Sequence, residues 1–114
     1  MLEISTRSVG EITVLELRGS LLAGSGLALL SQRVKQLVAE QKLNIVVNAK
    51  EVSVIDSSGV GDLVASFSLV KKSGGSLKVA NPTKLVRDVL RIARIPTIIE
   101  FFDTEEEALK AFEN

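Results

Sequence analysis

The chain has 114 residues, 46% of them hydrophobic, and its 14 Lys and Arg balance 14 Asp and Glu. This length suits one compact domain. A net charge of zero is not typical of a non-specific nucleic-acid binder, which carries a basic surface. Because the chain contains no His and no Cys, most metalloenzyme and hydrolase mechanisms are disfavoured. No cofactor and no metal site are expected.

The sequence shows no sign of a membrane segment. No stretch reaches the roughly 18 apolar residues that a transmembrane helix needs. Residues 1–10 carry Glu3 and Arg7, where a signal peptide would have an apolar core. We therefore expect a cytoplasmic protein without membrane contact.

The first half of the chain predicts a β-hairpin, a helix and a strand. Residues 2–7 and 12–18 have strand composition, Val9-Gly10 forms the turn between them, and Gly19 ends the second strand. A helical period then begins, with Ser25 as its expected cap. The apolar face of this helix consists of Leu27, Leu30, Val34, Leu37 and Val38. Residues 43–47 form a continuous apolar strand, and a short loop separates them from a second extended segment, 52–55.

The second half alternates helices with strands. A helix opens at residue 56 and closes at Lys71-Lys72 and Gly74-Gly75, and residues 77–80 form a strand. Asn81-Pro82-Thr83 starts a third helix, which Pro96 ends, and residues 97–101 form a last strand. Asp103-Thr104 caps a final helix. The helix that opens at residue 56 is expected to bury Val60, Leu63, Val64, Phe67 and Val70. The third helix is expected to bury Leu85, Val86, Val89, Leu90 and Ala93, and the final helix Ala108, Leu109 and Phe112.

This order of elements predicts an α/β fold. Strands that alternate with helices form βαβ units with right-handed crossovers. We expect a mostly parallel central sheet with an antiparallel N-terminal edge strand and about four helices. Function in such sheets gathers at the carboxyl ends of the strands, and the turn at residues 56–61 follows one of them.

That turn, Asp56-Ser57-Ser58-Gly59-Val60-Gly61, is the sharpest feature of the sequence. Its simplest interpretation is a capped helix start, with Asp56 or Ser57 as the N-cap. A functional interpretation adds to the first. A hydroxyl in the first turn of a helix lies near unpaired N–H groups and the positive end of the dipole, so a phosphate there would be stabilised locally. Asp56 would oppose that charge.

Three enzymatic interpretations of the turn fit poorly. A serine nucleophile would lack a His or an adjacent Lys as its base. Asp56 as a phosphoacceptor would need clustered carboxylates for a divalent cation, and the first strand offers only Glu3. Neither common phosphate-binding glycine motif follows a strand. Gly24-Ser25-Gly26 is either a weak anion site or a flexible turn. The sequence therefore predicts no catalytic residue.

The motif at residues 56–61 resembles the D-S-[ST]-G-[LV]-G signature of bacterial anti-sigma factor antagonists, which have the STAS fold (sulfate transporter and anti-sigma factor antagonist). The resemblance covers essentially the whole chain, so we expect a single STAS domain over residues 1–114. The further segments that are similar to the family are Leu15-Glu16-Leu17-Arg18-Gly19, Lys72-Ser73-Gly74-Gly75-Ser76-Leu77, Asn81-Pro82, Val86-Arg87-Asp88-Val89-Leu90, Ile92-Ala93-Arg94-Ile95 and Glu107-Ala108-Leu109.

The resemblance implies a partner switch and not an enzyme. In this family the unphosphorylated antagonist binds an anti-sigma factor, which is itself a serine kinase, and so frees a sigma factor. The kinase then phosphorylates the signature, here at Ser58 with Ser57 as the alternative, and a Ser/Thr phosphatase reverses the modification. The residues expected to contact the partner are Asp56, Ser57, Ser58, Gly59, Val60 and Gly61, with Leu21 and Leu22.

Two positions depart from the family pattern. Leu22 stands where many relatives have an acid, and Asn48 stands where they often have Asp, so both remove negative charge near the expected site. Leu21-Leu22 is either a partner contact or a buried strand end.

Two other functions stay open. One is a STAS adaptor in another assembly, such as a lipid-transport complex or a signalling scaffold. The other is a small-ligand or nucleotide-binding module that uses the glycine turns. We expect a monomer or a weak dimer. An exposed edge strand or Phe101-Phe102 could mediate the dimer, although Phe at a strand end is more often core.

Overall fold

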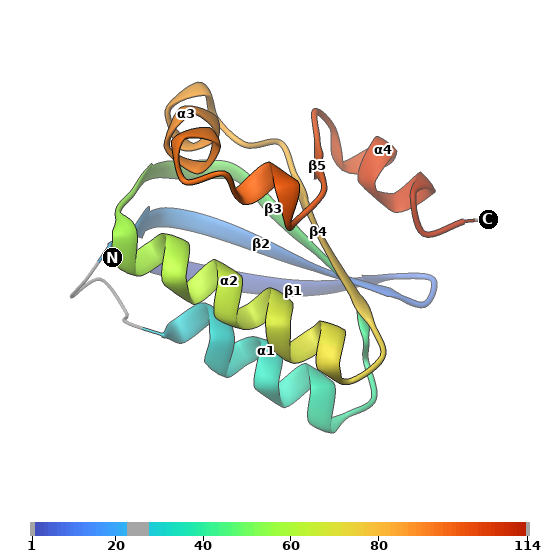
Figure 1. Cartoon of the computed structure of the whole chain (residues 1–114). Coiled ribbons are helices and arrows are strands. Elements are labelled where there is room, and N and C mark those ends of the chain that lie inside the picture. The colour runs from blue at the N-terminus through green and yellow to red at the C-terminus, as the bar shows by residue number, and fades with distance from the viewer. Residues whose placement is uncertain (1, 23–27, 114) are drawn as a thin grey trace.

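The computed structural model describes residues 2–22 and 28–113. Its centre is a five-stranded sheet in the order β1-β2-β3-β4-β5 (Figure 1). Only the β1–β2 pair is antiparallel, and the other strand pairs are parallel. The predicted α/β fold with an antiparallel edge strand is therefore confirmed. The elements are β1 (Leu2–Val9), β2 (Ile12–Leu21), α1 (Leu29–Ala39), β3 (Asn44–Ile55), α2 (Ser57–Lys72), β4 (Ser76–Ala80), α3 (Lys84–Ile92), the 3-10 helix η1 (Ile95–Thr97), β5 (Phe101–Phe102) and α4 (Glu105–Lys110).

The sheet carries an apolar core on each face. The large core lies between the sheet and helices α1, α2 and α3, and includes Ile45, Val47 and Leu90. A small second core holds Val46 of β3 under Ala108 of α4. Because successive strand residues point to opposite faces, the run at residues 45–47 is buried on both sides. This is the environment that the continuous apolar pattern predicted.

The N-terminal hairpin has the predicted turn but a longer second strand. Val9 pairs with Ile12 across a two-residue loop, in which Gly10 takes a φ of +60° that glycine adopts easily. The prediction that Gly19 ends the second strand was wrong, because β2 continues to Leu21. The pairing with β3 shifts register between Gly19 and Ser20. A bulge of this kind lets a strand pass an irregular residue and continue.

The loop predicted between residues 47 and 52 was also wrong. β3 is one continuous strand, and its pairing with β2 shifts register between Glu16 and Arg18. Asn48 stabilises the irregular segment, because its side-chain oxygen accepts a hydrogen bond from the Lys50 N–H at 3.0 Å. Three of the four residues at 48–51 are polar, but cross-strand pairing holds the segment in the sheet as a bulge, with Ala49 in the core.

The helices follow their predicted faces with three differences. Helix α1 begins at Leu29, while Leu27 and the expected cap Ser25 lie outside the described residues. In α3, Val86 and Leu90 are buried, but Leu85 is 50% exposed and Ala93 is also exposed. Leu85 lies about 100° around the helix from Val86, so it leaves the buried face. Ala93 follows the last helical residue, where the chain turns away.

The predicted strand over residues 97–101 was wrong. Arg94 adopts a φ of 60°, and the chain then forms η1 with Pro96 in its first turn, where a missing N–H is harmless. Only Phe101 and Phe102 pair with β4. Both are half-buried and pack against the two cores, so they occupy a core position at a strand end.

Candidate functional site

The motif at residues 56–61 forms a turn at the carboxyl end of β3, where it was predicted. The Asp56 N–H donates to the Leu21 carbonyl at 3.2 Å, which ties the turn to the end of β2. The Asp56 carboxylate accepts from the Gly59 N–H at 3.0 Å and so caps helix α2. Asp56, and not Ser57, is therefore the N-cap.

Gly59 allows the turn to lie directly on β2. Its backbone is buried, and a Cβ at this position would stand 2.1 Å from the Leu21 carbonyl oxygen and 2.8 Å from Cγ1 of Ile55. Real Cβ atoms do not approach backbone oxygen so closely, so a side chain would force the helix away from the strand. Gly61 differs, because a Cβ there would meet nothing within 4 Å.

The two serines stand in the first turn of the 16-residue helix α2. Ser57 is exposed and Ser58 is half-buried. Among the described residues, neither hydroxyl makes a hydrogen bond, and the N–H groups of both serines have no acceptor. Free N–H groups at the positive end of a helix favour an anion. A phosphate on either serine would meet this environment.

Leu21 and Leu22 have separate roles at the end of β2. Leu21 is 6% exposed and packs in the large core, so its side chain is a buried strand end. Its carbonyl is the part that meets the turn. Leu22 is half-buried and follows directly. Of the two leucines, Leu22 is therefore the one with exposed side-chain surface.

Sequence reasoning missed Asp62, which links the signature helix to α1. Its carboxylate accepts hydrogen bonds from the N–H groups of Leu30 and Ser31, each at 3.2 Å. Helix α1 needs this acceptor, because Ala28 at its N-cap position offers no side-chain bond. Asp62 also lies one turn after Ser58, on the same face of α2. The sequence feature that could have indicated Asp62 is its place four residues, or one helical turn, after Ser58.

Asn48 does not lie at the site, contrary to the expectation. It sits in the middle of β3 between Glu16 and Ala80, eight residues before Asp56. Its side-chain amide donates to Glu105 of α4 at 2.9 Å. Because β3 is extended from Asn44 to Ile55, Asn48 lies far along the strand from Asp56, whereas the loop predicted at this point could have brought the two residues together.

Glu105 is the centre of a polar cluster under α4. A hydrogen bond from the Arg7 guanidinium lowers the pKa of this carboxyl, burial opposes that effect, and the Asn48 amide lowers the pKa further. Arg7 also pairs with Glu16 at 3.1 Å. The cluster therefore joins β1, β2 and β3 to α4 and serves the fold.

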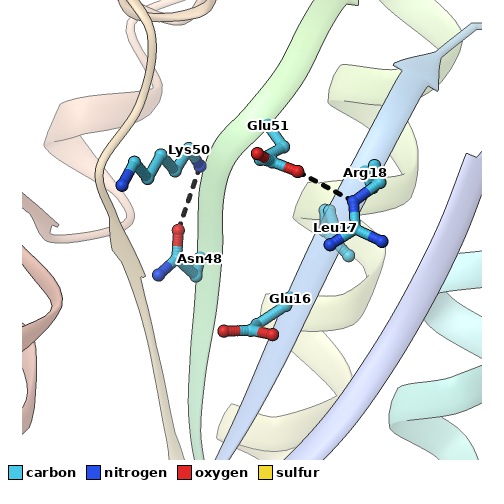
Figure 2. A pocket seen from close by; sticks show the side chains of 6 residues that line it. All are labelled: Glu16, Leu17, Arg18, Asn48, Lys50 and Glu51. Atoms are coloured by element: carbon cyan, nitrogen blue, oxygen red, sulfur yellow. Dashed lines mark hydrogen bonds and ion pairs between the residues drawn. The ribbon is translucent and has the colours of Figure 1, made fainter.

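A polar hollow of about 220 Å³ opens at the bulge between β2 and β3 (Figure 2). Arg18 and Glu51 form an ion pair at 2.8 Å beside it. Its volume lies below the roughly 300 Å³ at which typical ligand pockets begin. None of the residues expected to contact a partner lines it. The lining residues are Glu16, Leu17, Arg18, Asn48, Lys50 and Glu51.

Within residues 2–22 and 28–113, no three Asp or Glu side chains gather in a way that could hold a metal ion. In the same ranges, no helix has both the length and the apolar run that crossing a membrane requires.

Comparison with known proteins identifies relatives over most of the chain. The chain is 38% identical over 63 residues to the anti-sigma-B factor antagonist of Bacillus subtilis (strain 168), and the aligned segment covers 55% of this chain and 58% of that relative. The fold matches a candidate anti-sigma factor antagonist from Thermotoga maritima with a TM-score of 0.90 at 21% identity, over 97% of this chain and 95% of that one.

A third similarity is to the Bacillus cell-fate determinant SpoIIAA in its phosphorylated form, with a TM-score of 0.73 at 22% identity, over 97% of this chain and 100% of that one. At these identities the two structural matches establish the fold. The family model of the STAS domain matches residues 3–108 of this chain. The chain therefore belongs to the STAS domain family.

Proposed function

We propose that this protein is an anti-sigma factor antagonist whose binding to an anti-sigma factor is switched off by phosphorylation of Ser58. The observation that carries the proposal is the position of Ser58. It lies in the first turn of α2, capped by Asp56 and packed by Gly59 against β2. The names of the relatives support the same role, since one is the anti-sigma-B factor antagonist of Bacillus subtilis.

The partner in this proposal is an anti-sigma factor with serine kinase activity, and a Ser/Thr phosphatase restores the free hydroxyl. The chain acts in the cytoplasm as a single STAS domain, as a ligand and substrate of other proteins. It performs no reaction itself. SpoIIAA, whose fold is similar, has a phosphorylated form, and this supports a covalent switch in the present chain.

The surface that meets the kinase is small and mostly backbone. Ser57 and Gly61 are exposed, while Ser58 and Leu22 are half-buried. Glycine and short side chains let a partner approach the helix end closely. Leu22 gives this surface an apolar element in place of an acid, so we expect an apolar contact on the partner opposite it.

Electrostatics explain how a phosphate would release the partner. A phosphoserine adds a charge of roughly −1.5 to −2. At residue 58 the new charge lies one turn from Asp62 and beside the Asp56 cap. The free N–H groups of the turn hold the phosphate within the folded chain, so the fold survives. A partner surface that fits the neutral hydroxyl would instead have to desolvate a dianion, which costs several kcal/mol, or about a hundredfold or more in affinity.

The proposal is tested by phosphosite mapping together with binding. Mass spectrometry of the chain recovered from its native cells should find phosphate on Ser58. Ser58→Ala should bind the anti-sigma factor and resist phosphorylation, whereas Ser58→Asp should bind at least tenfold more weakly. Ser57→Ala is the matched control, because it removes the neighbouring hydroxyl of the same turn and should stay a kinase substrate.

Two outcomes would contradict the proposal. Equal affinity of Ser58→Ala and Ser58→Asp for the partner would remove the electrostatic switch. An unmodified Ser57-Ser58 peptide across growth and stress conditions, with a stably bound partner, would favour a STAS adaptor in another assembly. Phosphate on Ser57 alone would move the switch by one residue.

A further inference from the structure

Strand β1 is a long edge strand, and in the described sheet its outer side pairs with no other strand. It ends the strand order, and its pairing with β2 runs without a shift from Leu2–Gly19 to Val9–Ile12. Residue 3 and residues 5–9 are exposed, and the strand contains no proline. A regular, solvent-accessible edge of this kind is a template for another strand. The opposite edge, β5, has two residues and offers no comparable template.

The outward backbone groups of β1 belong to its even-numbered residues. The Ile4 carbonyl accepts from the Arg33 guanidinium of α1 at 3.5 Å, so it faces away from β2. In an antiparallel pair the N–H and C=O of one residue point to the same side. The hairpin geometry leads to the same result. The Val9–Ile12 pair closes a two-residue loop and is therefore hydrogen-bonded, so the odd-numbered residues of β1 bond to β2. The backbone N–H and C=O groups of residues 2, 4, 6 and 8 therefore point away from β2.

We propose that β1 pairs antiparallel with β1 of a second copy of this chain, about a two-fold axis at Ser5. Ile4 then exchanges backbone hydrogen bonds with Thr6 of the partner. Glu3 lies opposite Arg7 of the partner, and the symmetry gives the same pair twice. The two five-stranded sheets join into one continuous sheet.

The charges of β1 select this register. Only registers that pair even-numbered residues with even-numbered residues bring the outward backbone groups together. The two neighbouring registers of this kind place Glu3 opposite Ser5 or opposite Val9 of the partner, and both charge pairs are lost. The next register in each direction places Glu3 opposite Glu3 or Arg7 opposite Arg7, and like charges directly opposite destabilise a strand pair.

The two charged side chains are available for this contact. Within the described residues the Glu3 side chain makes no hydrogen bond and no ion pair, and it lies opposite Arg18 of β2, which pairs with Glu51. The Arg7 side chain is 40% exposed while it pairs with Glu16 and Glu105, and a guanidinium with five donors can hold another carboxylate. The Arg33 guanidinium also donates to the Thr6 hydroxyl oxygen at 2.9 Å, so it lies across this part of the edge. Pairing requires it to leave the Ile4 carbonyl, which then accepts a strand hydrogen bond instead. The contact is one strand wide, so we expect a weak dimer at high micromolar concentration.

A single cysteine tests the register directly, because the chain contains no cysteine of its own. In the proposed dimer Ser5 faces its own copy as a non-hydrogen-bonded pair, with Cα atoms about 4.5 Å apart. That separation lies within the range of about 4.4–6.8 Å that a disulfide spans. Oxidised Ser5→Cys should therefore form a covalent dimer. Thr6→Cys is the matched control, because residue 6 faces Ile4 of the partner. Equal cross-linking of both variants, or cross-linking of Thr6→Cys alone, would overturn the register.

A charge reversal tests the pairing without a cross-link. Glu3→Arg should weaken the dimer about tenfold or more in sedimentation equilibrium, because two attractive pairs become two repulsive ones. Glu11→Arg makes the same charge change in the exposed hairpin turn and should leave the dimer unchanged. A wild-type chain that stays monomeric at high micromolar concentration, or equal weakening by both variants, would refute the proposal. Neither result depends on Ser58, so the proposed switch is tested separately.

Discussion

Replacing Gly59 with alanine tests how closely the signature turn lies on the sheet. The added Cβ would stand 2.1 Å from the Leu21 carbonyl oxygen, whereas ordinary van der Waals contact begins at 3.4 Å. The first turn of α2 and the end of β2 must therefore separate by about 1.3 Å, the difference between these distances. That movement disturbs the hydrogen bond from Asp56 to Leu21 and the last pairing of β2 with β3.

The size of the effect follows from opposing contributions. Overpacking against backbone costs about 1–3 kcal/mol, and each disturbed hydrogen bond about 1 kcal/mol more. Alanine in a helix offsets this by about 1 kcal/mol because glycine is a poor helix former. We expect Gly59→Ala to lower the free energy of unfolding by about 2–4 kcal/mol.

Gly61 offers a matched control two residues further along the same helix. A Cβ there meets nothing within 4 Å, so only the helix propensity changes, and Gly61→Ala should stabilise the chain by about 0.5–1 kcal/mol. Urea denaturation followed by circular dichroism measures both variants, with an unchanged slope m as the condition for comparing them. If Gly59→Ala were as stable as Gly61→Ala, the turn would not rest on the Leu21 carbonyl and this reasoning would be refuted.

Two further changes probe the polar contacts of the fold. Asp62→Ala leaves the N–H groups of Leu30 and Ser31 without their acceptor, so the free energy of unfolding should fall by about 1–2 kcal/mol. The hydrogens of these two amides should also exchange faster with solvent, and an unchanged exchange rate would contradict the role of Asp62 as the cap of α1. The pKa of Glu105 is lowered in the folded chain from its ordinary 4.5, so its stabilising contribution is present above that pH and is lost as the pH falls through the lower folded value. Glu105→Gln should make the loss of stability in this acidic range shallower, and an unchanged profile of urea midpoint against pH would contradict the assignment.

Local patterns predicted most of the fold, because they reflect local physics. The start of α2 at Asp56 and the hairpin turn at Gly10 depend on capping and on backbone conformation, which neighbouring residues determine. The signature turn itself could be located for the same reason. Its motif joins an apolar strand to a capped helix, and the carboxyl end of a parallel strand is where such turns gather.

The failed predictions share another cause. The polar residues Asn48, Lys50 and Glu51 interrupt the apolar pattern as a loop would, but pairing with β2 keeps them in β3 as a bulge. Residues 97–101 have strand composition, but the turn at Arg94 and the 3-10 helix leave only Phe101-Phe102 beside β4. Strand pairing joins residues far apart in the sequence, so no local pattern contains it.

Periodicity, caps and glycines act over a few residues, so local patterns predict the order of the elements and the capped signature turn. The family was indicated by the resemblance of the motif at residues 56–61 and is shown by the family model. Which side chains share a surface depends on the tertiary structure. It buried Leu21, kept Asn48 far from the turn along β3, and placed Asp62 at the start of α1. These relations depend on how strands and helices pack in three dimensions, and spacing along the chain does not encode them.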